Sequence, residues 1–127
     1  MKPLQTIHIV SKSIDNRGQY LRLLELDTDH YCHAFPTLEA ALAHHTAPDF
    51  LLVDFSAIAT PMNPDRGIEP ICLFLQAYPE CHVVINSTVS EQTTRDLVED
   101  IKERKPAAKV YGTDCMDWEG TLSHFAG

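Results

Sequence analysis

The chain has 127 residues, a formal net charge of −8 and 44% hydrophobic residues, and this size predicts a single domain over residues 1–127 with one hydrophobic core. The negative charge and the scattered lysines and arginines argue against nucleic acid as a partner. Neither a secretory signal nor a run of about 20 apolar residues occurs, so we expect a cytoplasmic protein that does not bind a membrane.

Short apolar runs with strand character alternate along the chain with segments in which apolar residues recur at helical spacing. In chain order, the predicted elements are a strand at Thr6–Val10, a helix at Asp15–Leu26, a strand at Tyr31–Phe35, a helix at Thr37–His45, a strand at Phe50–Asp54, a helix that contains Ile68 to Leu75, a strand at His82–Asn86, a helix after Ser90, a strand at Lys109–Gly112 and a short helix near Asp117.

Two helices carry further signals. Thr37 is expected to cap the start of the second helix, and Pro48 to lie beyond its end. In the helix after Ser90, the residues Leu97, Val98 and Ile101 recur at helical spacing and are expected to form its buried stripe.

Asp54 is the residue that points most directly to a function, because it ends a strongly apolar strand. The alternation of strands and helices predicts a parallel sheet with helices on both faces. In such sheets, ligands and reacting groups lie just beyond the carboxyl ends of the strands. We therefore expect Asp54 at a functional crevice, next to the residues Ser11 and Lys12 that follow the first strand.

This order of elements, with an aspartate at the end of the third strand, resembles the receiver domain of bacterial response regulators in an atypical, pseudo-receiver form. The resemblance covers nearly the whole chain. It implies a flavodoxin-like (CheY-like) α/β fold, which is a three-layer α/β/α sandwich with a five-stranded parallel sheet in the order 2-1-3-4-5. It also implies a role in two-component signal transduction or a phosphorelay, and not an enzyme.

The polar positions of that family are partly altered here. In the family, the first strand ends in a pair of acids, the third in the phospho-accepting Asp, the fourth in Thr or Ser, and the fifth in Lys-Pro. The matching positions in this chain are Ser11-Lys12, Asp54, Ser87 and Asp114-Cys115. The switch aromatic of the family lies three residues before its lysine, as Tyr111 lies before Asp114. The resemblance thus implies Asp54 as the phospho-acceptor position and Ser87 and Tyr111 as switch positions.

The changed positions bear on metal binding. Magnesium prefers carboxylate and water oxygens, and phosphoryl transfer uses such a cation to neutralise charge. Lys12 instead supplies a positive charge, and it either points inward to bridge Asp54 and Asp114 or extends into solvent. We expect no cofactor. Magnesium is needed only if phosphorylation is retained, in which case Asp65 or Glu69 could restore a carboxylate.

The segment from Phe55 to Arg66 is longer than the usual connection in the family. It is interpreted as an inserted lid that covers Asp54 or contacts a partner, with Ile58 and Met62 exposed. A tolerated surface insertion is the alternative.

The leading functional hypothesis is a protein-interaction module that works without ordinary magnesium-dependent phosphorylation. The expected partner is a signalling protein, which is a histidine kinase, an output protein or domain, or a second copy of the chain. The resemblance implies a contact surface around Glu91 to Lys105, Tyr111 and Trp118. One alternative is a receiver that a histidine kinase phosphorylates on Asp54. Another is a flavodoxin-like binder of a small ligand, although no glycine-rich phosphate loop follows the first strand.

The cysteines and histidines are not spaced like metal ligands. The four cysteines lack a Cys-x-x-Cys pair and are expected to be reduced thiols, mostly in the core: Cys32, Cys72, Cys81 and Cys115. His30, Cys32 and His33 lie at or within one strand, in which successive residues face opposite ways, so no zinc site is expected. His44 and His45 lie at a helix end, where a positive charge is favourable.

Overall fold

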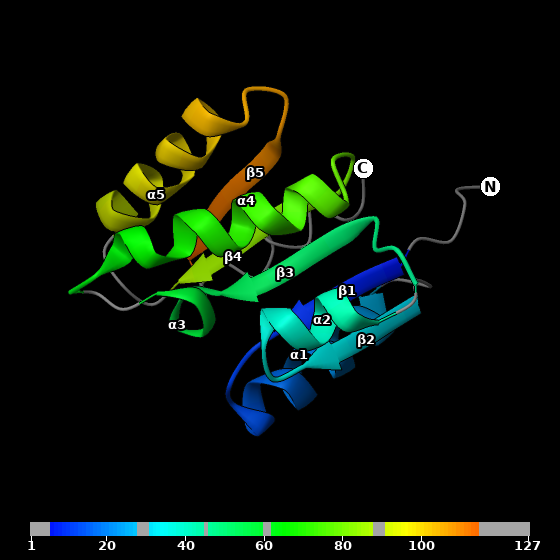
Figure 1. The fold of residues 1–127 in the computed structure, drawn as a ribbon. Coiled ribbons are helices and arrows are strands. Elements are labelled where there is room, and N and C mark those ends of the chain that lie inside the picture. The colour runs from blue at the N-terminus through cyan, green and yellow to red at the C-terminus, as the bar shows by residue number, and fades with distance from the viewer. Residues whose placement is uncertain (1–5, 28–30, 45, 60–61, 88–90, 115–127) are drawn as a thin grey trace.

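A parallel β-sheet forms the middle layer of the fold (Figure 1). The structure is a computed structural model that describes residues 6–27, 31–44, 46–59, 62–87 and 91–114. Within these residues the strands are β1 (Thr6–Val10), β2 (Tyr31–Phe35), β3 (Phe50–Asp54), β4 (His82–Ser87) and β5 (Lys109–Asp114). Their order is β2-β1-β3-β4-β5, which confirms the predicted topology.

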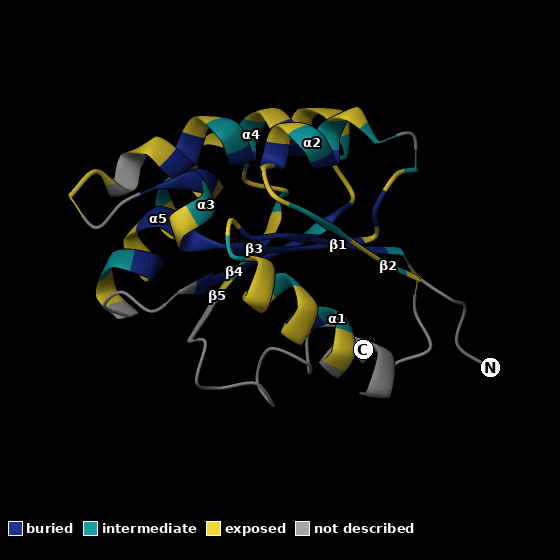
Figure 2. Ribbon diagram, turned by 90° about the horizontal axis from the view of Figure 1, so that it is seen from below, coloured by how far each residue is buried: buried dark blue, intermediate teal, exposed yellow. Residues whose placement is uncertain are grey.

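Helices cover both faces of this sheet (Figure 2). Helix α1 (Ile14–Asp27) lies on one face, and α2 (Leu38–Ala43), α4 (Ile68–Ala77) and α5 (Glu91–Arg104) lie on the other. The one-turn helix α3 (Phe55–Ile58) and the 3-10 helix η1 (Pro64–Gly67) follow β3. This arrangement confirms the three-layer α/β/α sandwich, and the predicted helix near Asp117 lies outside the described residues. None of the described helices is long and apolar enough to cross a membrane.

The element boundaries follow local chemistry closely. The bounds of β1, β2 and β3 are those predicted, and Thr37 caps α2 because its Oγ1 accepts the Ala40 N–H at 3.1 Å. Helix α2 ends at Ala43, earlier than predicted, because His44 already has extended backbone angles. Strands β4 and β5 run beyond their predicted ends because their pairing continues to Ser87 and Asp114.

Alternation along the strands divides the core between the two faces. Leu51 and Val53 of β3 pack toward α2, α4 and α5, whereas Phe50 and Leu52 pack toward α1. The predicted stripe of α5 is confirmed, since its three apolar residues are all buried. By the same alternation, Asp54 belongs to the face that α1 covers.

The segment after β3 is not a lid, so this prediction was wrong for its first half. Phe55, Ile58 and Ala59 are buried in the core beneath α2, α4 and α5. Ile58 was expected to be exposed, but the helical turn of α3 places it three residues after Phe55 and therefore on the same inward face. Met62 is 90% exposed, as predicted.

The three described cysteines, Cys32, Cys72 and Cys81, are not joined in disulfides. Cys81 is buried, and burial raises the pKa of its thiol to about 12, with a further contribution from Asp49. Cys81 is therefore protonated at neutral pH and does not act as a nucleophile there. Cys32 and Cys72 are partly buried, while Cys115 lies outside the described residues.

Gly112 provides a test of packing between β5 and α5. A Cβ added at this residue would lie 2.7 Å from Cγ2 of Thr94, whose β-branched side chain is stiff in a helix. We expect Gly112→Ala to lower the free energy of unfolding by about 1–3 kcal/mol through overpacking. Thr94→Ser removes the clashing methyl group and should restore most of this loss in the double variant, as measured by urea unfolding. An equal loss in both backgrounds would exclude this contact as the cause.

Candidate functional site

Four of the six sequence-predicted site residues lie at the carboxyl edge of the sheet. The Cα of Asp54 pairs with that of Asn86, and Ser87 pairs with Asp114. Ser11 follows Val10, which pairs with Val53, and so lies beside the end of β3. The edge therefore contains Ser11, Asp54, Ser87 and Asp114, although the structure does not describe the side chains of the last two.

Asp54 is held by hydrogen bonds from α1. Its carboxylate is buried, at 7% exposure, and Oδ1 accepts the Tyr20 hydroxyl proton at 2.7 Å. The Asn86 side-chain amide in turn donates to the Tyr20 hydroxyl oxygen at 2.8 Å. Asn16 Nδ2 lies 3.5 Å from Asp54 Oδ2, which is a longer and weaker contact. Tyr20 thus links two buried polar side chains at the ends of adjacent strands.

The sequence places both α1 residues on one face. Ser13 Oγ accepts the Asn16 N–H at 3.2 Å at the start of the helix. Asn16 and Tyr20 are four residues apart and therefore lie one above the other on the same side of α1. The sequence analysis did not identify Tyr20 as a residue of the site. The available signal was its hydroxyl, because a buried tyrosine usually finds a hydrogen-bond partner.

The loop after β1 is fixed by Ser11. This residue is buried, and its Oγ accepts the Ser13 N–H at 3.2 Å. Its carbonyl oxygen accepts a bond from Arg17 Nη1 at 2.6 Å. Lys12, between the two serines, is exposed. Of the two predicted directions of Lys12, extension into solvent is confirmed. The inward bridge to Asp54 and Asp114 is wrong, because this turn directs Lys12 to solvent and Tyr20 already donates to the Asp54 carboxylate.

The residues around Asp54 do not fit a magnesium site. Within the described part of the chain, no three histidine, cysteine, aspartate or glutamate side chains converge. The Ser11 carbonyl already accepts a bond from the positively charged Arg17, and Glu69 lies on α4, across the sheet from Asp54. The side chain of Asp65 is not described. Among the side chains described at this edge of the sheet, Asp54 supplies the hard anionic oxygens that magnesium prefers, and these oxygens already accept protein donors.

Tyr111 lies partly buried in β5, away from the network around Asp54. Its ring stacks on that of His82 with the centroids 6.3 Å apart, and Lys102 Nζ lies 5.9 Å from its centroid. A cation over an aromatic face is attracted by the ring quadrupole. Tyr111 is thus in contact with β4 and with α5, and α5 belongs to the surface that the resemblance implies.

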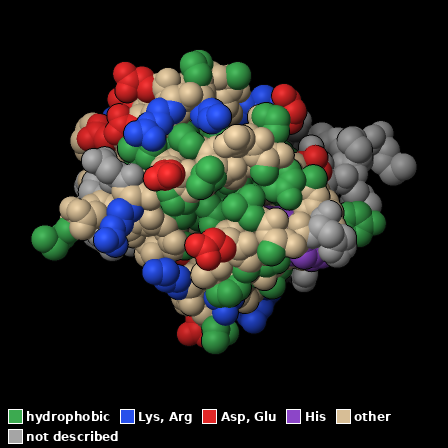
Figure 3. All heavy atoms as spheres, in the orientation of Figure 1, with side chains coloured by type: hydrophobic (Ala, Val, Ile, Leu, Met, Phe, Trp, Pro, Cys, Tyr) green, Lys and Arg blue, Asp and Glu red, His purple; other side chains and the backbone are tan. Residues whose placement is uncertain are grey.

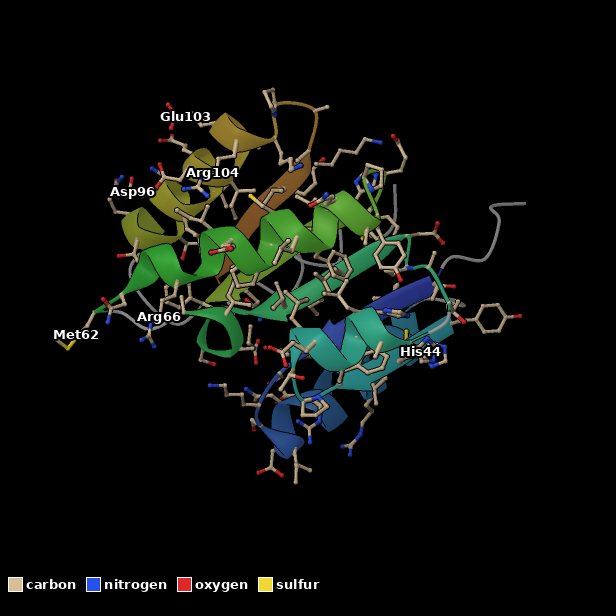
Figure 4. The ribbon with its side chains drawn as sticks, viewed as in Figure 1. His44, Met62, Arg66, Asp96, Glu103 and Arg104 are labelled. Atoms are coloured by element: carbon tan, nitrogen blue, oxygen red, sulfur yellow. The ribbon has the colours of Figure 1, made fainter. Side chains whose placement is uncertain are left out.

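A histidine cluster, which the sequence analysis did not identify, lies on the opposite face of β1. His8 is fully buried, and its ring lies 5.3 to 5.8 Å from those of His44 and His33. His33 is its direct partner in the register of β1 and β2, and His44 lies at the end of α2 (Figure 4). Burial lowers the pKa of His8 to about 4, helped by the charges of His44 and His33. His8 is therefore neutral at pH 7, and neither of its ring nitrogens has a partner among the described residues.

Comparison with solved structures identifies the fold. The BeF3-activated receiver domain of DrrB from Thermotoga maritima superposes with a TM-score of 0.72 at 18% identity, over 98% of this chain and 96% of that one. A CheY-like receiver protein from Methanospirillum hungatei JF-1 gives 0.71 at 14% identity, over 98% and 92%. The signal receiver domain of a putative Luxo repressor from Vibrio parahaemolyticus gives 0.68 at 12% identity, over 98% and 88%. No family model and no curated protein matches the sequence.

Proposed function

We propose that this chain, which has the fold of CheY-like receiver domains, is an atypical receiver that works as a protein-interaction module in two-component-type signalling. In this proposal Asp54 has a structural role and does not undergo ordinary magnesium-dependent phosphorylation. The observation that carries the proposal is the bond from the Tyr20 hydroxyl to the Asp54 carboxylate, which Asn86 supports from the other side.

The chemistry of phosphoryl transfer explains why this bond matters. A carboxylate that attacks a phosphoryl group needs a free oxygen in line with the leaving group and a cation that neutralises the charge. Here Oδ1 of Asp54 lies in the buried interior and accepts a short bond from Tyr20. For one oxygen to attack while the other binds the cation, Asp54 would have to release Tyr20 and leave its buried hydroxyl without this acceptor, which is unfavourable.

The proposed partners are signalling proteins, either a histidine kinase or an output protein. Their proposed contact surface includes α5 and Tyr111, and Trp118 belongs to it only by the resemblance. Every residue of α5 outside its buried stripe is polar or charged, and Figure 4 shows Asp96 and Glu103 directed away from the sheet. Such a surface suits a partner that is recognised through charge complementarity, which favours specific and rapid association.

Phosphorylation of Asp54 is the second candidate function. It is favoured by the position of Asp54 at the carboxyl end of β3, where this class of sheet usually has its functional crevice. In this case a histidine kinase would supply the phosphoryl group, and Ser87 would lie at the neighbouring strand end. The two candidates differ in their response to magnesium.

Proton–nitrogen NMR spectra distinguish these two candidates. Spectra of labelled protein are recorded alone, with millimolar Mg²⁺, and with Mg²⁺ plus beryllofluoride, which imitates an aspartyl phosphate. We expect the amide signals of Asp54, Ser87 and Tyr111 to stay unchanged, because the donor set does not fit the metal. Beryllofluoride-dependent shifts that are lost in Asp54→Asn would reject the structural role of Asp54 and establish the phospho-acceptor.

A further inference from the structure

An apolar groove lies between α2, α3 and α4, on the face of the sheet opposite to Asp54. Its volume is about 540 Å³, within the range of roughly 300–1,000 Å³ that is typical of binding clefts. Apolar side chains from all three helices line it: Leu38, Leu42, Ile58, Pro70 and Leu73. Figure 3 shows hydrophobic side chains gathered over α2 and α4 on this face.

The composition of α4 distinguishes this face from an ordinary solvent-exposed surface. Glu69 and Gln76 are the two polar residues among the 10 of α4, and Leu73 is 54% exposed. Glu39 is likewise the one polar residue of α2. A helix with a solvent-exposed face normally carries polar residues there, as α5 does outside its buried stripe. Helices α2 and α4 therefore have the composition of helices whose outer sides are covered.

Charged residues at the groove indicate what covers it. Glu39 and Glu69 contribute carboxylates to its lining, and Arg66 contributes one guanidinium group. Glu69 also lines a smaller polar pocket with Asp100, Glu103 and Arg104 of α5, where three carboxylates outnumber one guanidinium group, so the mainly acidic border continues past α4. The whole chain has a formal charge of −8. A second copy would bring the same carboxylates and the same net charge to this surface, and like charges in an interface are unfavourable.

We propose that this groove binds an amphipathic helix of a partner protein, with its apolar side in the groove and lysine or arginine residues beside Glu39 and Glu69. Helix-in-groove recognition uses apolar side chains at positions i, i+3, i+4 and i+7. The groove offers apolar contacts from α2 and α4 for such a row. This inference rests on the proposed function as an interaction module, but it does not depend on the chemical state of Asp54.

The test uses a synthetic 18-residue peptide that has leucines at positions i, i+3, i+4 and i+7 of a helix and lysines on the opposite side. Its binding is measured by fluorescence anisotropy, and its contacts are mapped by amide NMR shifts. A peptide with glutamate in place of lysine and a scrambled peptide of the same composition are the reference probes. We expect saturable binding of the basic helical peptide alone, with shifts at Leu42, Ile58 and Leu73.

Matched variants separate groove binding from unspecific attraction between a basic peptide and an acidic protein. Leu73→Glu adds a negative charge inside the groove and should weaken binding at least tenfold. Met62→Glu adds the same charge at a 90% exposed residue that does not line the groove (Figure 4) and should change binding less than twofold. Leu73→Gln provides a neutral variant of the same position, and NMR spectra verify that each variant folds.

Three results would overturn the proposal. The first is that the basic helical peptide does not bind, or that it binds no more tightly than the scrambled peptide. The second is unchanged or tighter binding to Leu73→Glu, since attraction by net charge alone predicts this direction. The third is a concentration-dependent dimer in sedimentation experiments that Leu73→Glu abolishes, which would identify a second copy as the occupant. The beryllofluoride spectra test Asp54 separately, so either proposal can fail without the other.

Discussion

Replacing Tyr20 with phenylalanine is expected to lower the free energy of unfolding by about 1–3 kcal/mol, the usual cost of leaving buried polar groups without a partner. The hydroxyl of Tyr20 donates to Asp54 and accepts from Asn86, and all three side chains are buried. The substitution removes one oxygen atom and keeps the ring that packs in the core beneath α1. Urea unfolding at pH 7 measures the loss. Tyr31→Phe removes the hydroxyl of a tyrosine that is 60% exposed, so it should change stability by less than about 0.5 kcal/mol.

A double-mutant cycle assigns this loss to the contact with Asp54. Tyr20→Phe, Asp54→Ala and the double variant are compared, and the double variant should lose less stability than the two single variants together. A coupling of about 0.5–3 kcal/mol is expected for groups in one hydrogen-bond network. If the losses of the two single variants simply add in the double variant, the Tyr20–Asp54 contact does not contribute to stability. The structural role of Asp54 would then have no support.

The fold could be predicted from the sequence because each strand is marked locally. The run from Phe50 to Val53 is apolar on both faces of the sheet, as expected for a central strand covered by two layers of helices. Thr37 marks the start of α2 by its capping hydroxyl. Where the boundaries differ from the prediction, as at the ends of β4 and β5, the cause is pairing between strands. Such pairing depends on the neighbour and is not visible in one segment.

The site could be predicted only in outline, because side-chain directions depend on contacts between distant segments. The position of Asp54 at the carboxyl edge followed from the order of elements, but its partner Tyr20 lies 34 residues away. Charge alone left the direction of Lys12 open between an inward bridge and solvent. The hydrogen bonds of Ser11 with Ser13 and Arg17 determine the course of that loop, and they leave Lys12 exposed.

The histidine at the centre of β1 predicts a dependence of stability on pH. His8 has a pKa of about 4 in the folded protein, below the ordinary value of 6.5. Between these two values the unfolded chain binds more protons than the folded one, so stability falls as the pH is lowered. The contribution is fully present above pH 6.5 and fully lost below about pH 4. At 1.36 kcal/mol per pH unit, this difference amounts to roughly 3 kcal/mol.

The groups that face His8 explain why it stays neutral. Burial is the largest cause of the lowered pKa of His8, and Coulombic repulsion from His44, which follows α2, and from His33 of β2 lowers it further. Phe35, also from β2, packs its ring 5.0 Å from that of His8. A proton on His8 would therefore place a charge in an apolar and partly cationic environment, where it has no described acceptor.

His8→Leu is the variant that tests this linkage, because leucine suits a fully buried strand position. It should unfold with a stability close to or above that of the parent at pH 7, since two unpaired buried nitrogens are removed. Its advantage over the parent should grow by roughly 3 kcal/mol as the pH falls from 6.5 to 4. Carboxylate titration affects both proteins alike, so the difference between their urea unfolding free energies isolates His8.

His33→Gln is the control variant. It removes only a secondary cause of the lowered pKa of His8, so its stability should depend on pH nearly as steeply as that of the parent. If the unfolding free energies of the parent and His8→Leu change in parallel between pH 6.5 and 4, the pKa of His8 is not lowered in the folded protein.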